Sequence, residues 1–95
     1  MNNFCDGFVD NVYNKAIRKT LKQLRENKKY SFKQLAVMMN KKISRQTLHH
    51  YESGKSRVRI DILKELAKIY NLTEKEMFYM ITINYFIELN KYLEN

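Results

Sequence analysis

Five polar side chains in the middle of the chain carry groups that form directional hydrogen bonds with nucleic-acid bases. They are Arg45, Gln46, Thr47, His49 and His50. An arginine fork matches the two acceptors on the major-groove edge of guanine, and a glutamine amide can donate to and accept from adenine. A threonine methyl can contact the methyl group of thymine, and histidines can donate to bases or phosphates. These residue types predict a surface that reads base edges.

A helix has to position these side chains, and the flanking residues supply its start and its end. Ser44 can accept hydrogen bonds from the first free N–H groups of a helix, and Gly54 can adopt the left-handed conformation that ends one. Leu48 and Tyr51 fall on the opposite side from the polar groups. The sequence therefore predicts a helix over about residues 44–53 whose polar side faces outward.

The two adjacent histidines have other interpretations. His49 and His50 could be solvated side chains on an exposed helix, with no ligand at all. A metal site is disfavoured because adjacent side chains point about 100° apart on a helix. Cys5 is the only other cysteine or histidine in the chain. We therefore expect neither a metal ion nor another cofactor.

Positive charge is concentrated in the central part of the chain. The net charge is +8, yet residues 15–59 contain fourteen lysines and arginines against only Glu26 and Glu52. A segregated positive field attracts a polyphosphate partner and makes binding weaken as salt is added. The alternative is a basic face that is merely solvated.

Length and composition indicate a single all-helical domain. The chain has 95 residues, no proline and two glycines, and 95 residues are enough for one hydrophobic core. The single cysteine, Cys5, cannot form an internal disulfide, which favours a reducing cytoplasm. No basic region followed by an apolar run predicts a secretory signal, and no stretch approaches the roughly 18 apolar residues of a membrane span.

Apolar periodicity and capping residues predict the helices. After a flexible start at residues 1–7, helices are expected at about residues 8–27, 31–39, 44–53, 60–70 and 73–93. Ser31 with Gln34, and Thr73 with Glu76, have the spacing of capping boxes at two helix starts. Asn40 can take a left-handed conformation in the turn before residue 44.

An ordered set of residues extends over about residues 17–78. It consists of Leu21-Lys-Gln-Leu24-Arg25, Ser31 with Leu35-Ala36, Ile43-Ser44, Leu48, Glu52, Gly54 and Leu66-Ala67. The set resembles the phage-repressor and Cro-type helix-turn-helix family. The resemblance implies a compact five-helix domain, with its DNA-binding core at residues 8–79 and its third helix in the major groove. It also implies an ion pair between Arg25 and Glu52 that turns this acid away from DNA.

The resemblance and the positions around the third helix also imply contacts with DNA phosphates, which position a protein without reading sequence. The expected set is Ser44, Ser53, Lys55, Arg57 and Arg59. Family members often begin the second helix with a glutamine that holds a phosphate, whereas this chain has Phe32 there. We expect Lys33, Lys41 or Lys42 to supply that contact, and Phe32 to pack inward or to lie against sugar edges.

The last predicted helix is apolar on more than one face. Of the seventeen residues from Met77 to Leu93, twelve are Met, Phe, Tyr, Ile or Leu, and Asn84 and Glu88 are among the polar interruptions that argue against membrane insertion. A small domain can cover only one face of such a helix. The other is expected to meet a second copy in a twofold dimer, although a monomer that buries the whole helix is an alternative. The expected dimer residues are Met80, Ile83, Phe86, Ile87 and Leu89.

Together these features predict a sequence-specific double-stranded DNA-binding transcriptional regulator, a dimeric repressor that reads the major groove. The alternative is an antitoxin or anti-repressor type of module that binds a partner protein through its C-terminal helix. Catalysis is not expected, because no glycine-flanked nucleophile, phosphate loop or paired acid motif is present. The expected location is the cytoplasm of a bacterium, with the protein encoded by the bacterium or a phage and associated with the nucleoid when bound.

Overall fold

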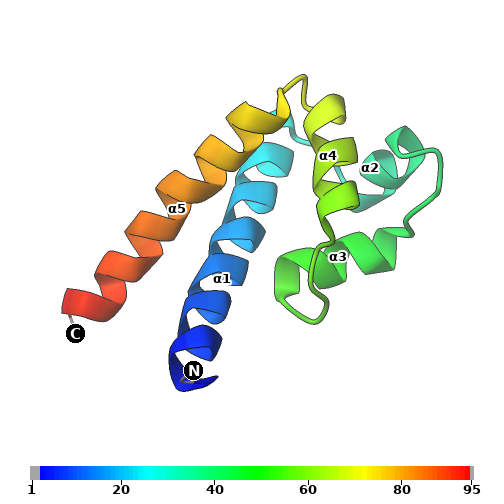
Figure 1. The fold of residues 1–95 in the computed structure, drawn as a ribbon. Helices are drawn as coiled ribbons and strands as arrows, with labels where there is room; N and C mark the ends of the chain where they lie inside the picture. Colours follow the sequence, from blue (N-terminus) through cyan, green and yellow to red (C-terminus); the bar gives the residue numbers. More distant parts are fainter. Residues whose placement is uncertain (1–2, 95) are drawn as a thin grey trace.

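Five α-helices make up the regular structure of the computed structural model, which describes the backbone of residues 3–94 and the side chains of residues 11–94 (Figure 1). They are α1 (Asn3–Lys28), α2 (Phe32–Met38), α3 (Arg45–Ser53), α4 (Ile60–Ile69) and α5 (Glu74–Glu94). The all-α, five-helix fold predicted from the sequence is confirmed.

The two long helices form an antiparallel pair, and the three short helices lie on one side of it. In Figure 1, α1 and α5 run side by side, so that the start of α1 and the end of α5 lie at the same end of the pair. The core is built by apolar side chains from all five helices. Its members include Ala16, Leu21, Leu24, Leu35, Ala36, Leu48, Tyr51, Leu63, Leu66, Met77 and Ile81.

The first helix starts earlier than the sequence predicts. α1 begins at Asn3, whereas the sequence predicts a flexible start at residues 1–7 and a helix from residue 8; residues 1 and 2 lie outside the described residues. Adding residues to an existing helix costs far less than nucleating one, and no proline interrupts this segment. The other four helices begin and end within one residue of their predicted bounds.

The predicted helix caps are present. Ser31 Oγ accepts a hydrogen bond from the N–H of Gln34 at 3.1 Å, and Gln34 Oε1 accepts one from the N–H of Ser31 at 2.8 Å. Thr73 and Glu76 form the same reciprocal pair at the start of α5. In the turn after α2, Asn40 is left-handed as expected, with a φ of 56°.

Polar side chains are buried where α5 packs on α1, which the sequence did not predict. Asn84 Nδ2 donates to Thr20 Oγ1 at 2.8 Å and to Gln23 Oε1 at 3.0 Å. The Thr20 hydroxyl in turn donates to the carbonyl oxygen of Ala16 at 2.8 Å. Because hydrogen bonds are directional, this chain of bonds favours one alignment of α5 along α1.

Glu88 lies on the same buried side of α5 among three lysines. Its carboxylate oxygens are 3.2 Å from Lys91 Nζ, 3.5 Å from Lys19 Nζ and 3.8 Å from Lys15 Nζ. Burial acts to raise the pKa of Glu88, but the hydrogen bond from Lys91 and the three positive charges together lower it below its ordinary value. Charged Glu88 therefore stabilises the fold at neutral pH, and this stability is lost as the pH falls through the lowered pKa.

Arg25 connects α1 to the short helices. Its Nε and Nη2 donate to Glu52 Oε2 and Oε1 at 2.7 and 3.0 Å, which forms the ion pair that the resemblance implied. Its Nη1 donates to the carbonyl oxygen of Tyr30 at 3.0 Å, and its Cζ lies 4.2 Å from the centre of the Phe32 ring. The hydrogen bond to Glu52 is the main cause that raises the pKa of Arg25.

We expect Arg25→Lys to lower the free energy of unfolding by about 2 kcal/mol or more, because lysine cannot form this two-bond fork in a partly buried site. Arg59 provides a matched control, since it also makes two hydrogen bonds to a carboxylate, that of Asp61, but on the exposed surface. Arg59→Lys should leave stability unchanged. Urea denaturation measures the free energy of unfolding of both variants. Equal losses would show that the Arg25 contacts stabilise the fold no more than the exposed Arg59 pair does.

The hydroxyl of Tyr70 is buried and has no hydrogen-bond partner among the described residues. Its ring stacks against Tyr30, with 6.1 Å between the ring centres. Burial, followed by the negative charge of Glu52, raises the pKa of Tyr70 to about 12. An unsatisfied buried hydroxyl costs free energy, so the hydroxyl of Tyr70 destabilises the folded state.

Tyr70→Phe is therefore expected to raise the free energy of unfolding, by up to about 1 kcal/mol at neutral pH. The variant should also lose less stability at high pH than the wild-type protein does. Unfolded tyrosine ionises near its usual pKa of 10 whereas folded Tyr70 stays protonated to about 12, so that stability falls between these values. Thermal unfolding at several pH values measures this, with exposed Tyr79→Phe as the control. A destabilised Tyr70→Phe would mean that the hydroxyl is satisfied.

Candidate nucleic-acid interface

The polar side chains of α3 form two rows along its outer surface. Arg45 and His49 are four residues apart, as are Gln46 and His50, so that each pair lies along one line of the helix. Arg45, Gln46 and His49 are exposed, and His50 is half-buried. The opposite side of α3 is buried in the core. Four of the five predicted base-reading residues therefore share one outward surface.

Thr47 and Ser44 are bonded to each other at the start of α3. Ser44 Oγ accepts a hydrogen bond from the N–H of Thr47 at 3.1 Å and donates its own proton to Thr47 Oγ1 at 2.9 Å. Ser44 is thus the N-cap, as the sequence predicts. Only the Ser44 hydroxyl proton is used in this bond, so that Thr47 can still offer its methyl group and its own hydroxyl proton to a base or phosphate.

Phe32 packs between α1 and α3 at the start of α2. Its ring contacts the Arg25 guanidinium on one side and meets the His49 ring edge to face, with 5.3 Å between the ring centres. The side chain is half-buried, so that of the two alternatives inward packing is the one observed. Phe32 therefore packs against His49, whose ring remains exposed and able to form hydrogen bonds.

The side chains expected at DNA phosphates surround α3 on three segments. Besides Ser44, they are Lys33 at the start of α2, Lys41 and Lys42 in the following turn, and Ser53, Lys55, Arg57 and Arg59 at and after the end of α3. Those seven side chains are exposed. Ser53 Oγ donates to the carbonyl oxygen of His50 at 3.3 Å, so its hydroxyl is already engaged at the end of the helix.

Arg59 is paired with a carboxylate on the surface. Its Nη2 lies 2.7 Å from Asp61 Oδ2, and its hydrogen bond to Asp61 is the main cause that lowers the pKa of this acid. A phosphate would therefore compete with Asp61 for Arg59. Sequence reasoning missed this pair, although an acid two residues after an arginine at a helix start was the available signal.

Glu52 is the only acidic residue of α3, and its charge is balanced within the fold. Its side chain is 9% exposed and accepts both hydrogen bonds of the Arg25 fork. The carboxylate is consequently held against α1 instead of the outer surface of α3. An approaching phosphate meets arginine, lysine and neutral polar groups there.

α5 has a buried side and an exposed apolar side that lie opposite each other. The buried residues are Met77, Ile81, Asn84 and Glu88. We define the α5 apolar face by its exposed residues Tyr79, Ile83, Phe86 and Ile87. Three of the five predicted dimer residues are on this face, whereas Met80 and Leu89 are half-buried beside it. Tyr79 was missed because the sequence could not tell which of two apolar sides packs on α1.

Between residues 3 and 94, no helix is long and apolar enough to cross a membrane. The described residues contain no group of three side chains able to hold a metal ion. The rings of His49 and His50 are tilted by 52° with centres 6.4 Å apart, in keeping with adjacent positions on a helix.

Comparison with known proteins identifies the family. A family model described as helix-turn-helix matches residues 21–77, which is more than half of the chain. The match covers the second part of α1, all of α2, α3 and α4, and the start of α5. No curated protein and no solved structure matches the chain. The chain belongs to the Cro/C1-type helix-turn-helix family of DNA-binding regulators.

Proposed function

We propose that the protein is a sequence-specific double-stranded DNA-binding transcriptional regulator that acts as a dimeric repressor. The observation that carries the proposal is the outer surface of α3, where Arg45 and Gln46 are exposed while Glu52 is bound by Arg25. This surface lies in a stretch with fourteen basic residues and two acidic ones. Hydrogen-bonding groups that read bases thus stand within a positive field that attracts the DNA backbone.

Base reading is assigned to the N-terminal part of α3. Arg45 would donate two hydrogen bonds to guanine, and Gln46 would pair with adenine; each such contact discriminates by about 1–3 kcal/mol. His50 continues the row of Gln46 toward the next bases, and the Thr47 methyl suits a thymine. His49 is supported by Phe32 at the edge of this surface.

Phosphate binding is assigned to the exposed groups on both sides of α3. Lys33, Lys41 and Lys42 would hold the backbone on the α2 side, and Lys55, Arg57 and Arg59 on the other. Many family members have a glutamine at the position of Phe32, where it binds a phosphate. Lys33 is the next residue along the chain and would supply that phosphate contact instead. Ser44 and Ser53 mark the two ends of α3 and would lie nearest the sugar-phosphate chains.

Dimerisation is assigned to the α5 apolar face. It is uncharged, and twofold pairing sets the same side chains against each other without repulsion between like charges. Monomeric proteins rarely leave a contiguous apolar surface of this kind exposed. A twofold dimer would present two α3 helices to half-sites about one DNA turn apart, and its occupation of such a site would exclude other proteins. The setting would be the bacterial cytoplasm, on the nucleoid.

The same face supports a second candidate function. An antitoxin or anti-repressor type of module would use Tyr79, Ile83 and Phe86 to bind a different protein, with DNA binding secondary. The concentration of positive charge around α3 favours the regulator, because a protein-binding role for α5 does not require it.

Arg45→Ala and Gln46→Ala should each reduce the preference for the selected site over random duplex by about tenfold to a hundredfold while weak, salt-sensitive binding remains. The site is first selected from a random pool, and affinities are then measured by fluorescence anisotropy at two salt concentrations. Lys33→Ala is the control, because loss of a phosphate contact lowers affinity for all duplexes alike. The assignment of α3 is wrong if both variants bind the selected site as well as the wild-type protein.

Phe86→Glu should convert a wild-type dimer into a monomer at micromolar concentration, because pairing across a twofold axis would bury two carboxylates close together. Sedimentation velocity measures the mass. Ile60→Glu introduces the same kind of charge at an equally exposed apolar position on α4 and should remain dimeric. A wild-type monomer would contradict the dimer and favour the partner-protein alternative.

A further inference from the structure

The exposed side of α5 has the spacing of a heptad repeat. Tyr79, Ile83, Phe86, Asn90 and Leu93 are separated by four, three, four and three residues, which places them in one nearly straight row along a helix. All five side chains are exposed, and we call this row the α5 seam. Its first three residues belong to the α5 apolar face, so the seam continues that face almost to the end of the helix.

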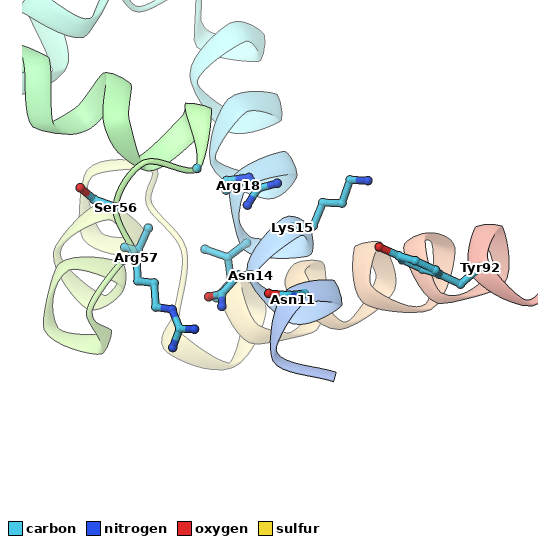
Figure 2. Close-up of a pocket in the computed structure, with 10 residues that line it drawn as sticks. Asn11, Asn14, Lys15, Arg18, Ser56, Arg57 and Tyr92 are labelled. Atoms are coloured by element: carbon cyan, nitrogen blue, oxygen red, sulfur yellow. The ribbon is translucent and has the colours of Figure 1, made fainter. Parts of the chain in front are cut away.

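The opposite side of α5 is occupied within the same copy. Asn84 and Glu88 are buried and contact side chains of α1. Near the end of α5, Tyr92 reaches toward α1, where it lines a cavity together with Asn11 and Asn14 (Figure 2). A seam of only two heptads is too short to pair as isolated helices. Because α1 already holds α5 as a helix, pairing along the seam has no new helix to form.

The residue types of the seam favour two parallel helices. Ile83 and Asn90 occupy the positions named a in a heptad, and Leu93 occupies a position named d. A β-branched residue at a with leucine at d is typical of parallel pairs, and a single asparagine at a fixes the register and the number of helices. In parallel, in-register copies the two Asn90 amides lie side by side, and one can donate to the oxygen of the other. Antiparallel pairing away from Asn90 would bury each amide without this partner, at a cost in free energy.

The residues that flank the seam favour a second copy as its partner. Met80 and Ile87 lie on one side of it and Thr82 and Leu89 on the other, and all four are uncharged. Identical copies therefore meet without repulsion between like charges along these flanks, and no charge selects a partner of opposite sign. A different protein would have to supply its own amide opposite Asn90, whereas a second copy supplies it by symmetry.

We propose that two copies pair through the α5 seam in parallel and in register, and that Asn90 is the residue that determines this orientation. The inference rests on the dimer of the proposed function and specifies how that dimer is built. The twofold axis runs parallel to α5, and the two α5 helices lie between the two α1 helices.

Disulfide formation tests the orientation in the full chain. Cys5 is the only cysteine, so Cys5→Ser gives a background without thiols, into which Tyr79→Cys or Leu93→Cys is introduced. Parallel, in-register pairing brings each position next to its equivalent, and we expect both variants to form disulfide-linked dimers in glutathione buffer. These positions are fourteen residues apart, or about 21 Å along a helix. Antiparallel pairing can therefore bring at most one of them next to its equivalent.

Ile60→Cys in the same background is the control, because it is an exposed apolar position on α4 outside the seam; it should not become linked. Non-reducing electrophoresis detects the linked dimers, and sedimentation velocity measures the mass of the reduced proteins. If the reduced variants are dimers but only one of the two seam variants becomes linked, or neither does, the parallel pairing is wrong and the dimer of the proposed function still stands. A wild-type monomer would contradict both.

The role of Asn90 is tested by exchanging charges. Asn90→Asp and Asn90→Lys should each raise the dissociation constant of the dimer at least about tenfold, because each sets two like charges against each other. An equimolar mixture of the two variants should restore the dimer, since parallel, in-register pairing sets a carboxylate beside an ammonium group. Asn27→Asp, at an exposed position of α1, should associate as the wild-type protein does. A mixture that is no more dimeric than the separate variants would overturn the assignment of Asn90.

Discussion

A partly buried guanidinium is stable only where its donors and its charge are matched, and Arg25 meets this condition with groups from three segments. Its donors reach Glu52 at the end of α3 and the Tyr30 carbonyl in the turn before α2, and its face lies on Phe32. One side chain of α1 therefore constrains how α2 and α3 are set relative to each other. Since α3 carries the exposed Arg45 and Gln46, the direction in which those groups point depends on this contact. The same contact removes the only carboxylate of α3 from the outer surface.

The pairing of α1 with α5 is constrained in a different way, by buried polar groups in an otherwise apolar contact. Asn84 bonds to Thr20 and Gln23, and one turn further along α5 Glu88 lies among lysines of α1 and its own helix. Breaking such contacts by a shift along the helix would leave buried polar groups unpaired, which costs more than loss of the hydrogen bonds alone. The side of α5 that packs is thereby fixed, and the α5 apolar face is left on the opposite side. The α5 apolar face is thus exposed because Asn84 and Glu88, on the other side of the helix, are buried against α1.

Local rules were sufficient to predict the fold class, the helix bounds after α1 and the caps at Ser31, Ser44 and Thr73, because each depends on residues three or four apart. The Arg25–Glu52 pair joins residues 27 positions apart, and it was anticipated only through resemblance to a family. The packing side of α5 was not predictable. Its contacts join residues more than 60 positions apart, and in the sequence Asn84 indicated only that the helix is not inserted in a membrane. For the site, the residue types on α3 were evident from the sequence, whereas the Phe32 contacts and the pairing of Arg59 with Asp61 required coordinates.

Gly54 joins the end of α3 to the loop that leads into α4. Its φ of 88° ends α3 in a conformation that side chains rarely adopt, and its missing Cβ also lets the Arg18 guanidinium approach the loop backbone. One backbone position thus ends the helix that would read DNA and sets how closely α1 approaches the loop. Because Lys55 and Arg59 follow on the same loop, this position also helps to determine where two of the cations assigned to DNA phosphates lie. A side chain at residue 54 would therefore disturb the end of the proposed base-reading helix and the proposed phosphate contacts together.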